Sequence, residues 1–420
     1  MTDNAIEEAR AHYVDAAKLR YPQTFELSER WSHWSHLSAD RIAVFASTEE
    51  AIHYAQQYLG FEHRHSADNS KSHWPKYDSA LKADFPDQID LIERLSESPL
   101  SHPKTIADFH GRAMSNVMFW HAYEFLATYC PLGDVGAIAE IGGGVGVLAR
   151  LWLENSNKLK TYILTDFPES LFYAELYLRH HFSETDIHYV TESDGCDVLD
   201  KATIFLCPAQ LAGNLEGIGV DLAINSGSMQ EMTEDAVLWW CDWLENGDIK
   251  YFYSLNYGLQ PIHARRGGSA NWMCPRLGPF WDTLQLRLDP PIVREQSLRH
   301  YREVLYRRTT SQDTKERAER ASALLAAHST PVSINREQSV LELLDALRLS
   351  PSIGLVMRLV QILGTLFDYR PKELIYVCRI GLGLSDANDN ERKILTDLLS
   401  ELTEIAAEEH SASVPSTPLF

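Results

Sequence analysis

The sequence has no Cys-x-x-Cys pair among its six cysteines, no excess of basic residues and no metal-site spacing of acidic residues. The scattered cysteines exclude a disulfide framework and a regularly spaced zinc site, and they are typical of buried thiols in a reducing compartment. The net charge of −21 repels phosphate backbones and anionic lipid surfaces, so we expect neither a nucleic-acid partner nor a membrane partner. No metal site is predicted.

Signals for secretion and membrane insertion are also missing from the residues given. The first residues are acidic and lack the basic and apolar regions of a signal peptide. The most apolar stretch, Ile353–Phe367, is interrupted by Arg358 and Gln361 and is too short to span a bilayer. We therefore expect a cytoplasmic protein.

Three zones with different residue patterns follow one another along the chain. Residues 1–115 have helical spacing of apolar residues and are expected to form a helical N-terminal cap. Residues 116–310 alternate strands with helices, which predicts an α/β fold with a Rossmann-like sheet of seven strands. Residues 311–410 return to helices, and the tail at 411–420 has the composition of a disordered segment.

Each zone predicts particular elements. In the cap, Ala5–Leu19, Glu49–Leu59 and Gln88–Leu95 are predicted helices, whereas the His- and Ser-rich Glu62–Tyr77 is predicted to be a loop. The predicted strands of the second zone are Ala137–Ile141, Tyr162–Thr165, Asp221–Asn225 and Tyr251–Leu255, with Ile187–Val190 and Thr203–Cys207 competing for one further position. Leu284–Leu288 and Glu303–Arg308 are expected to form an antiparallel pair at the sheet edge.

The third zone predicts five helices, at Thr314–Ala327, Glu337–Leu347, Gly354–Phe367, Lys372–Leu382 and Glu391–Glu408. Similar segments begin at Leu347 and Leu382, and their spacing is close to the roughly 34-residue period of tetratricopeptide repeats. The C-terminal module is therefore weakly tetratricopeptide-like.

The strongest local feature is a glycine-rich loop that follows the predicted strand Ala137–Ile141. Gly142, Gly144 and Gly146 allow the backbone to turn tightly and to approach a ligand, and the amides of the next helix then face that ligand. A dinucleotide fingerprint requires glycine where Val147 stands, and a phosphate loop requires Gly-Lys-Ser/Thr. S-adenosylmethionine (SAM) is cationic and tolerates the neighbouring Glu140, which would repel a pyrophosphate. A purely structural glycine turn is the remaining alternative.

A second acidic residue ends the next predicted strand. The carboxylate of Asp166 can accept hydrogen bonds from both hydroxyls of a ribose. Its alternative role is to cap the helix Glu169–His181, and the two roles are compatible. Phe167 could pack on an adenine face, while Asp194 and Gln210 compete for the adenine edge.

These strings resemble a known family. Glu140-Ile-Gly-Gly-Gly-Val-Gly resembles motif I of class I SAM-dependent methyltransferases. More narrowly, residues 105–310 resemble a bacterial family of sugar O-methyltransferases, through that loop, Asp166-Phe-Pro-Glu-Ser, Asn225-Ser-Gly-Ser-Met-Gln-Glu-Met and Tyr251-Phe-Tyr-Ser-Leu-Asn. The resemblance implies SAM as cofactor, with Glu140, Gly142, Gly144, Gly146 and Asp166 as cofactor residues. Gly143, Phe167 and Asn225 are further expected cofactor residues of this chain.

The chain also departs from this family. Phe167 stands where leucine is usual, and Ser226 and Gly227 stand where threonine and aspartate are frequent. The last two positions lie beside the methyl group that would be transferred. They leave the acceptor open.

Methyl transfer to a hydroxyl needs a base, which we expect on a loop after the fourth or fifth strand. His263 has a near-neutral reference pKa and lies beside Arg265 and Arg266, so it is the first candidate. Glu231 is the second, with support of the following helix as its alternative role. His110 and His121 could reach the site from the preceding helix, although most helix histidines are simply packed.

The predicted activity is therefore transfer of a methyl group to a hydroxyl of a sugar or sugar-containing metabolite. Another small molecule is an alternative acceptor, as is a peptide or protein partner presented by the C-terminal helices. An inactive SAM-fold interaction protein is the alternative from a different class. The intact Glu140, glycines and Asp166 argue against it.

Overall fold

A computed structural model of the chain describes residues 4–20, 29–58, 67–98, 100, 116–183, 186–195, 202–215, 217–257, 277, 281–287, 290, 301–309, 319, 322–323, 326, 343–344, 346–347, 350–363 and 371–412. Its centre is an eight-stranded sheet of order β3-β4-β2-β1-β5-β6-β8-β7. The strands are β1 (Ala137–Ile141), β2 (Thr161–Asp166), β3 (Ile187–Tyr189), β4 (Ile204–Pro208), β5 (Val220–Ser226), β6 (Ile249–Tyr257), β7 (Trp281–Arg287) and β8 (Tyr301–Arg308).

The sheet confirms the expected α/β class but has one strand more than predicted. The strands β3, β4, β2, β1, β5 and β6 run parallel, while β8 is antiparallel to both β6 and β7, as the expected antiparallel pair requires. The two candidates that seemed to compete for one position are both strands, because β3 pairs with the outer edge of β4. Tyr189 of β3 is covered there by His12, whose ring stacks on it at 4.9 Å.

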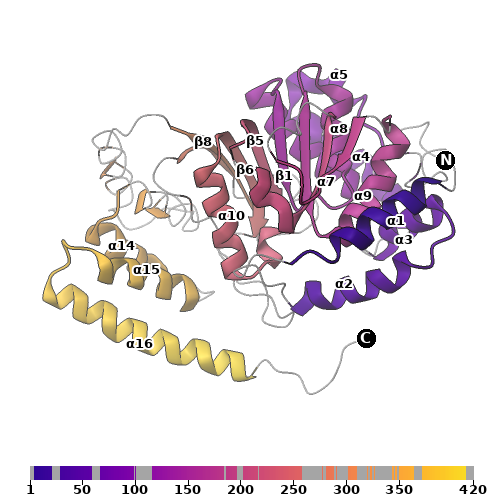
Figure 1. Cartoon of the computed structure of the whole chain (residues 1–420). Coiled ribbons are helices and arrows are strands. Elements are labelled where there is room, and N and C mark those ends of the chain that lie inside the picture. Colours follow the sequence, from indigo (N-terminus) through magenta and orange to yellow (C-terminus); the bar gives the residue numbers. More distant parts are fainter. Residues whose placement is uncertain are drawn as a thin grey trace.

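Helices cover both faces of the sheet (Figure 1). On one face lie α7 (Asn116–Leu132), α8 (Val147–Asn155) and α9 (Pro168–His181), and on the other lie η4 (Ala209–Leu215) and α10 (Glu234–Asn246). Strand residues alternate between the two cores: Ile138 packs with the first group, whereas Ala139 and Ile141 pack with the second. Thr233 caps α10, since its side chain accepts the N–H of Ala236.

The N-terminal helices share the core of the first face. They are α1 (Asn4–Ala16), α2 (Glu29–Ile42), α3 (Thr48–Tyr58), α4 (Ala67–Asp84), η1 (Pro86–Gln88) and α5 (Ile89–Ile92). The first three pack on α9, and α4 packs on α7. The prediction of a loop over Glu62–Tyr77 is wrong from residue 67 onward. There Tyr77, Leu81 and Phe85 recur at helical spacing and are buried, with Tyr77 stacked on Phe119 at 4.2 Å, so packing favours a helix despite the polar composition.

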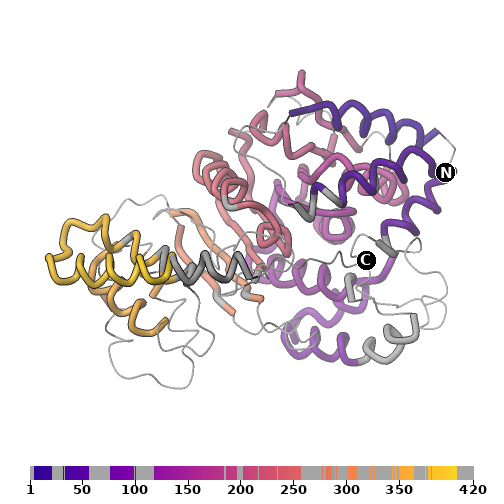
Figure 2. The backbone as a smooth tube through the Cα atoms, turned by 90° about the horizontal axis from the view of Figure 1, so that it is seen from below, coloured from indigo at the N-terminus to yellow at the C-terminus, as the bar shows by residue number. Residues whose placement is uncertain are grey.

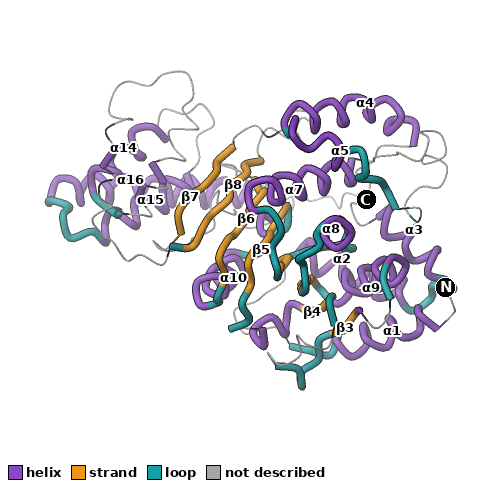
Figure 3. Tube along the Cα trace, turned by 90° about the horizontal axis from the view of Figure 1, so that it is seen from above, coloured by secondary structure: helices purple, strands orange, loops and turns teal. Residues whose placement is uncertain are grey.

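The C-terminal helices α14 (Ile353–Leu363), α15 (Pro371–Gly383) and α16 (Asp389–Ala412) have a hydrophobic core of their own. They lie together on the β7 side of the sheet (Figures 2 and 3). The predicted helices at 314–327 and 337–347 fall largely outside the described residues. The helix α16 continues to Ala412, two residues into the segment 411–420 that was expected to be disordered.

None of the described helices is long and apolar enough to cross a bilayer.

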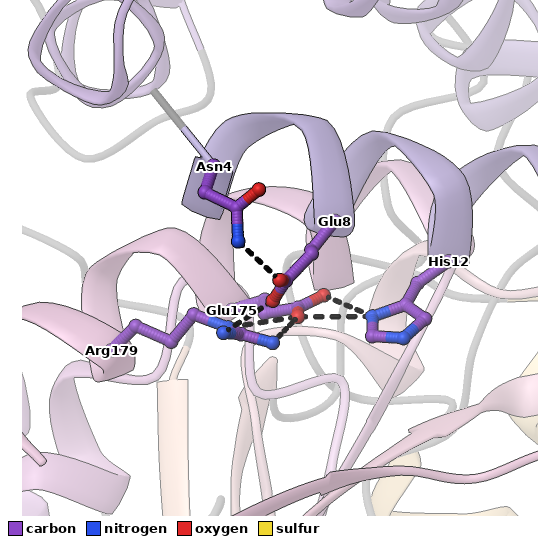
Figure 4. Close-up of polar contacts among 5 residues, drawn as sticks. All are labelled: Asn4, Glu8, His12, Glu175 and Arg179. Atoms are coloured by element: carbon purple, nitrogen blue, oxygen red, sulfur yellow. Dashed lines mark hydrogen bonds and ion pairs between the residues drawn. The ribbon is translucent and has the colours of Figure 1, made fainter. Parts of the chain in front are cut away.

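An ion-pair network fastens α1 to α9 (Figure 4). His12 Nδ1 lies 3.0 Å from both carboxylate oxygens of Glu175, which is fully buried. Arg179 bonds the same carboxylate at 2.8 Å and reaches Glu8 at 3.0 Å. The hydrogen bond with Glu175 raises the pKa of His12, an effect that Glu8 supports and that burial and Arg179 oppose.

This network predicts pH-dependent stability. Because the folded-state pKa of His12 lies above its ordinary value of 6.5, its contribution is complete below pH 6.5 and is lost as the pH rises through the folded-state value. We expect urea unfolding of the wild type to show a larger loss of stability between pH 6 and pH 8.5 than unfolding of His12→Asn. Equal losses in the two proteins would contradict this assignment.

Candidate cofactor-binding site

The glycine loop lies where the strand order of the sheet reverses. From β1 the chain moves outward to β2 and then to β3 at the sheet edge. It places β4 between them and then crosses to the other side of β1 to form β5. Ligands of open α/β sheets bind at such a switch point, beside the carboxyl ends of the strands. Residues 142–146 connect the carboxyl end of β1 to α8, so the loop is at this position.

The loop needs its glycines for conformation and for space. Gly142, Gly144 and Gly146 have φ of 74°, 58° and 86°, in the left-handed region that glycine adopts without penalty. A Cβ at residue 142 would lie 2.2 Å from Ser228 Oγ, and one at residue 143 would lie 2.8 Å from Glu140 Cδ. A structural role therefore accompanies any ligand role.

Asp166 at the end of β2 holds the loop from the neighbouring strand. Its Oδ2 accepts the N–H of Gly144 at 2.7 Å, and its Oδ1 accepts the N–H of Phe167 at 2.7 Å. Burial raises the pKa of Asp166 to about 6, although these bonds and one from Ser170 oppose the rise. A carboxylate can accept about four hydrogen bonds and the protein supplies three, so one position remains, and contact with a ribose hydroxyl stays a prediction.

Two further carboxyl groups lie close to the loop. Glu140 is buried on β1 and accepts the hydroxyl of Tyr162 at 2.7 Å. Burial raises the pKa of Glu140 well above its ordinary value, and the charges of Glu124 and Asp166 add to the rise. Glu124, on α7, is fully buried and was not singled out from the sequence. This end of the sheet is therefore acidic.

Asn225 is predicted to bind the cofactor, but its side-chain amide makes all of its hydrogen bonds with other protein groups. Its Nδ2 donates to the carbonyl of Ile141 at 2.8 Å and to Ser228 Oγ at 2.5 Å. Its Oδ1 accepts from Met229 N at 3.2 Å and from Asn256 Nδ2 at 2.9 Å. These four bonds use the full capacity of the amide, so in this structure Asn225 braces the end of β1 against β5 and β6.

The structure separates the two candidates for an adenine edge. Asp194 is already occupied, because its Oδ2 accepts from Thr191 N at 2.8 Å and lies 3.0 Å from His188 Nε2. Gln210 follows β4, next to the strand of Asp166, and its buried Oε1 has no hydrogen-bond partner among the described residues. Such an acceptor suits an amino group of a ligand. Phe167 is mostly buried at the same end of the sheet.

Of the two predicted bases, Glu231 lies within the described residues and His263 does not. Glu231 ends the short helix η5 (Met229–Glu231) after β5, and its backbone N–H donates to the carbonyl of Ser228. Its side chain is partly exposed. His263, with Arg265 and Arg266, lies outside the described residues, as does His110. The role of each stays a prediction.

His121 is within the described residues and belongs to a polar cluster at the same edge. Its Nδ1 lies 2.8 Å from Glu124 Oε2. The indole N–H of Trp120 donates to Glu124 Oε1 and, at 2.9 Å, to Ser226 Oγ at the end of β5. The i, i+3 spacing of His121 and Glu124 on a helix is the sequence signal that could have indicated this pair.

No family model matches this sequence, and the comparison with curated proteins gives no match. Several solved methyltransferase structures are distantly similar. An S-adenosylmethionine-dependent methyltransferase from Mesorhizobium loti is 15% identical over 44% of this chain and 98% of that chain, with a TM-score of 0.32. The mitomycin 7-O-methyltransferase MmcR is 14% identical over 49% of this chain and 58% of that chain, with a TM-score of 0.31. Phosphoethanolamine N-methyltransferase 1 from Haemonchus contortus is 12% identical over 59% of this chain and 50% of that chain, with a TM-score of 0.33.

Proposed function

We propose that this protein is a SAM-dependent methyltransferase. The observation that carries the proposal is the glycine loop at the strand-order reversal, with the carboxyl groups of Glu124, Glu140 and Asp166 around it. A cationic ligand that brings its ammonium and sulfonium groups here is stabilised by these carboxyl groups. The pyrophosphate of a dinucleotide would be repelled by them.

The residues present fit such a ligand along the edge of the sheet. The remaining acceptor position of Asp166 would accept a ribose hydroxyl, and Gln210 Oε1 would accept an amino hydrogen of adenine. Glu140 would face the cationic end across the glycine loop. When bound, SAM supplies an electrophilic methyl group for transfer to a nucleophile.

We propose a hydroxyl of a sugar or sugar-containing metabolite as the acceptor. Polar and aromatic groups gather where β5 ends, a combination that suits a hydroxylated ring. Gln230 Nε2 donates to the hydroxyl of Tyr301 at 2.6 Å, and the rings of Tyr301 and Trp120 meet edge to face at 4.9 Å. The string Asn225-Ser-Gly-Ser-Met-Gln-Glu-Met, through which the chain resembles sugar O-methyltransferases, includes Gln230 and ends beside this cluster.

Calorimetric titration tests the proposed cofactor. We expect the purified chain to bind SAM and S-adenosylhomocysteine with micromolar affinity and to give no signal with NAD, because the acidic edge repels the pyrophosphate. Acceptors can then be sought with radiolabelled SAM and a panel of free sugars and uncharged glycosides, because the acidic edge would also repel the pyrophosphate of a nucleotide sugar. A folded sample that binds neither SAM nor S-adenosylhomocysteine would refute the enzyme assignment and favour a non-catalytic interaction protein.

A further inference from the structure

A histidine and a buried glutamate are paired on the first half of α7. His121 Nδ1 and Glu124 Oε2 are 2.8 Å apart, and the side chain of Glu124 is fully buried while that of His121 is 19% exposed. The second oxygen of Glu124 accepts the indole N–H of Trp120. Both carboxylate oxygens therefore face N–H donors, and the carboxylate is fixed in position.

This pair is connected to the carboxyl end of β5. Trp120 connects it to β5, because the same indole N–H also reaches Ser226 Oγ at 2.9 Å. The charge of Glu124 also contributes to the raised pKa of Glu140 on β1, the strand from which the glycine loop continues. Viewed from above, α7 lies alongside β5 and next to α8, the helix that begins directly after the glycine loop (Figure 3).

The partner of Nδ1 determines where the proton of a neutral His121 resides. An ionised carboxylate can only accept, so the hydrogen must be on Nδ1 and the lone pair on Nε2. A histidine that is merely packed normally has both nitrogens satisfied. For Nε2 of His121, the described part of the chain provides no hydrogen-bond partner, and the ring is partly open to solvent.

We propose that His121 is the general base of the reaction and that Glu124 is its positioning residue. This inference rests on the methyltransferase function proposed above. The acceptor oxygen forms a bond to the methyl carbon as the sulfur–methyl bond breaks, and the bonding pair returns to sulfur, which becomes a neutral thioether. The hydroxyl proton moves to Nε2 of His121. Glu124 stabilises the resulting imidazolium, which releases the proton to solvent.

The arrangement favours His121 over the base candidates that the sequence alone indicated. Glu231 follows β5 on the short helix η5 and is partly exposed, whereas His121 lies on α7 with Nδ1 2.8 Å from a buried carboxylate. A base that is oriented by a second group is the usual construction in enzymes that deprotonate a hydroxyl. His121 meets that requirement within one turn of a helix.

Nitrogen NMR of the full chain tests the geometry without turnover. With ¹⁵N-labelled histidine, we expect His121 to show the Nδ1–H tautomer at pH 8 and to change its signals when S-adenosylhomocysteine saturates the protein. The exposed His36 on α2 is the internal control and should not respond. An Nε2–H tautomer, or no response of His121 while calorimetry shows binding, would overturn the inference. Failure of the folded wild type to bind S-adenosylhomocysteine would instead refute the methyltransferase function.

Kinetics then separate a base from a packed residue. His121→Asn keeps an N–H that can reach Glu124 but has no basic nitrogen at the Nε2 position. With the acceptor that the sugar panel yields, we expect kcat to fall roughly 100-fold or more. The KM for SAM and the S-adenosylhomocysteine affinity should stay unchanged. Glu124→Gln should lower kcat less, and His36→Asn should have no effect. A kcat of His121→Asn within about threefold of wild type would place the base elsewhere.

Discussion

Replacement of Asp166 by alanine is expected to weaken SAM binding by about 100-fold, which corresponds to roughly 3 kcal/mol. The carboxylate accepts the N–H groups of Gly144 and Phe167, each at 2.7 Å, and with the bond from Ser170 it keeps one acceptor position for the ribose. Its loss therefore removes a ligand contact and releases the glycine loop from β2. Calorimetry with SAM and with S-adenosylhomocysteine measures both affinities.

Asp221 provides the matched control at the opposite end of the same sheet. Its Oδ2 accepts two backbone N–H groups, from Gly136 at 2.7 Å and Ala137 at 3.1 Å, at the amino end of β1. Asp221→Ala thus removes an equivalent brace far from the carboxyl ends of the strands. We expect its SAM affinity to match the wild type; a loss equal to that of Asp166→Ala would mean that general loosening of β1 explains both.

The raised pKa of Asp166 adds a pH signature to the same experiment. Because this pKa is about 6, the carboxyl group is protonated below that pH and can no longer accept at all of its lone pairs. SAM affinity should therefore decrease as the pH falls from 7 to 5. Asp166→Asn should have lower affinity and lack this part of the pH dependence.

Periodicity and turn chemistry predicted much of the fold because the sheet is strongly patterned. The β1 strand reads as a short apolar run ending in glycines, and Thr233 has the side chain that a helix start needs. The segment at 67–77 was mispredicted because its composition is polar and the packing of Tyr77 on Phe119 involves residues distant in sequence. The strand β3 was ambiguous because its position depends on pairing with β4 alone.

The residues of the candidate site were likewise predictable only in part. Glu140, Gly142 and Asp166 could be chosen from the sequence because a strand-loop-helix places them at one edge by local rules. Glu124 could be indicated only in part: its i, i+3 spacing from His121 is a local pattern, whereas its connection through Trp120 to the end of β5 is a contact between residues distant in sequence. Asn225 could be placed at the end of its strand from the sequence. Only the three-dimensional contacts show that protein groups occupy the hydrogen-bonding positions of its side-chain amide.

Replacement of Gly142 by alanine is expected to abolish measurable SAM binding and to destabilise the protein by roughly 2–5 kcal/mol. Residue 142 has φ of 74°, which costs a residue with a side chain about 1–2 kcal/mol. The new methyl group would also lie 2.2 Å from Ser228 Oγ, so the loop or the turn after β5 must move. Urea unfolding and calorimetry measure the two effects.

Gly133→Ala separates backbone strain from the clash. Its φ of 67° is similar, but a Cβ there would meet nothing within 4 Å, so we expect only the smaller, conformational part of the loss and normal SAM affinity. The clash itself is tested by comparing Gly142→Ala in two backgrounds, the wild type and Ser228→Gly. If Ser228 obstructs the new methyl group, alanine at 142 should lower the free energy of unfolding less in the Ser228→Gly background. Equal losses in both backgrounds would show that backbone strain alone explains why residue 142 is glycine, and that the close approach of Ser228 does not contribute.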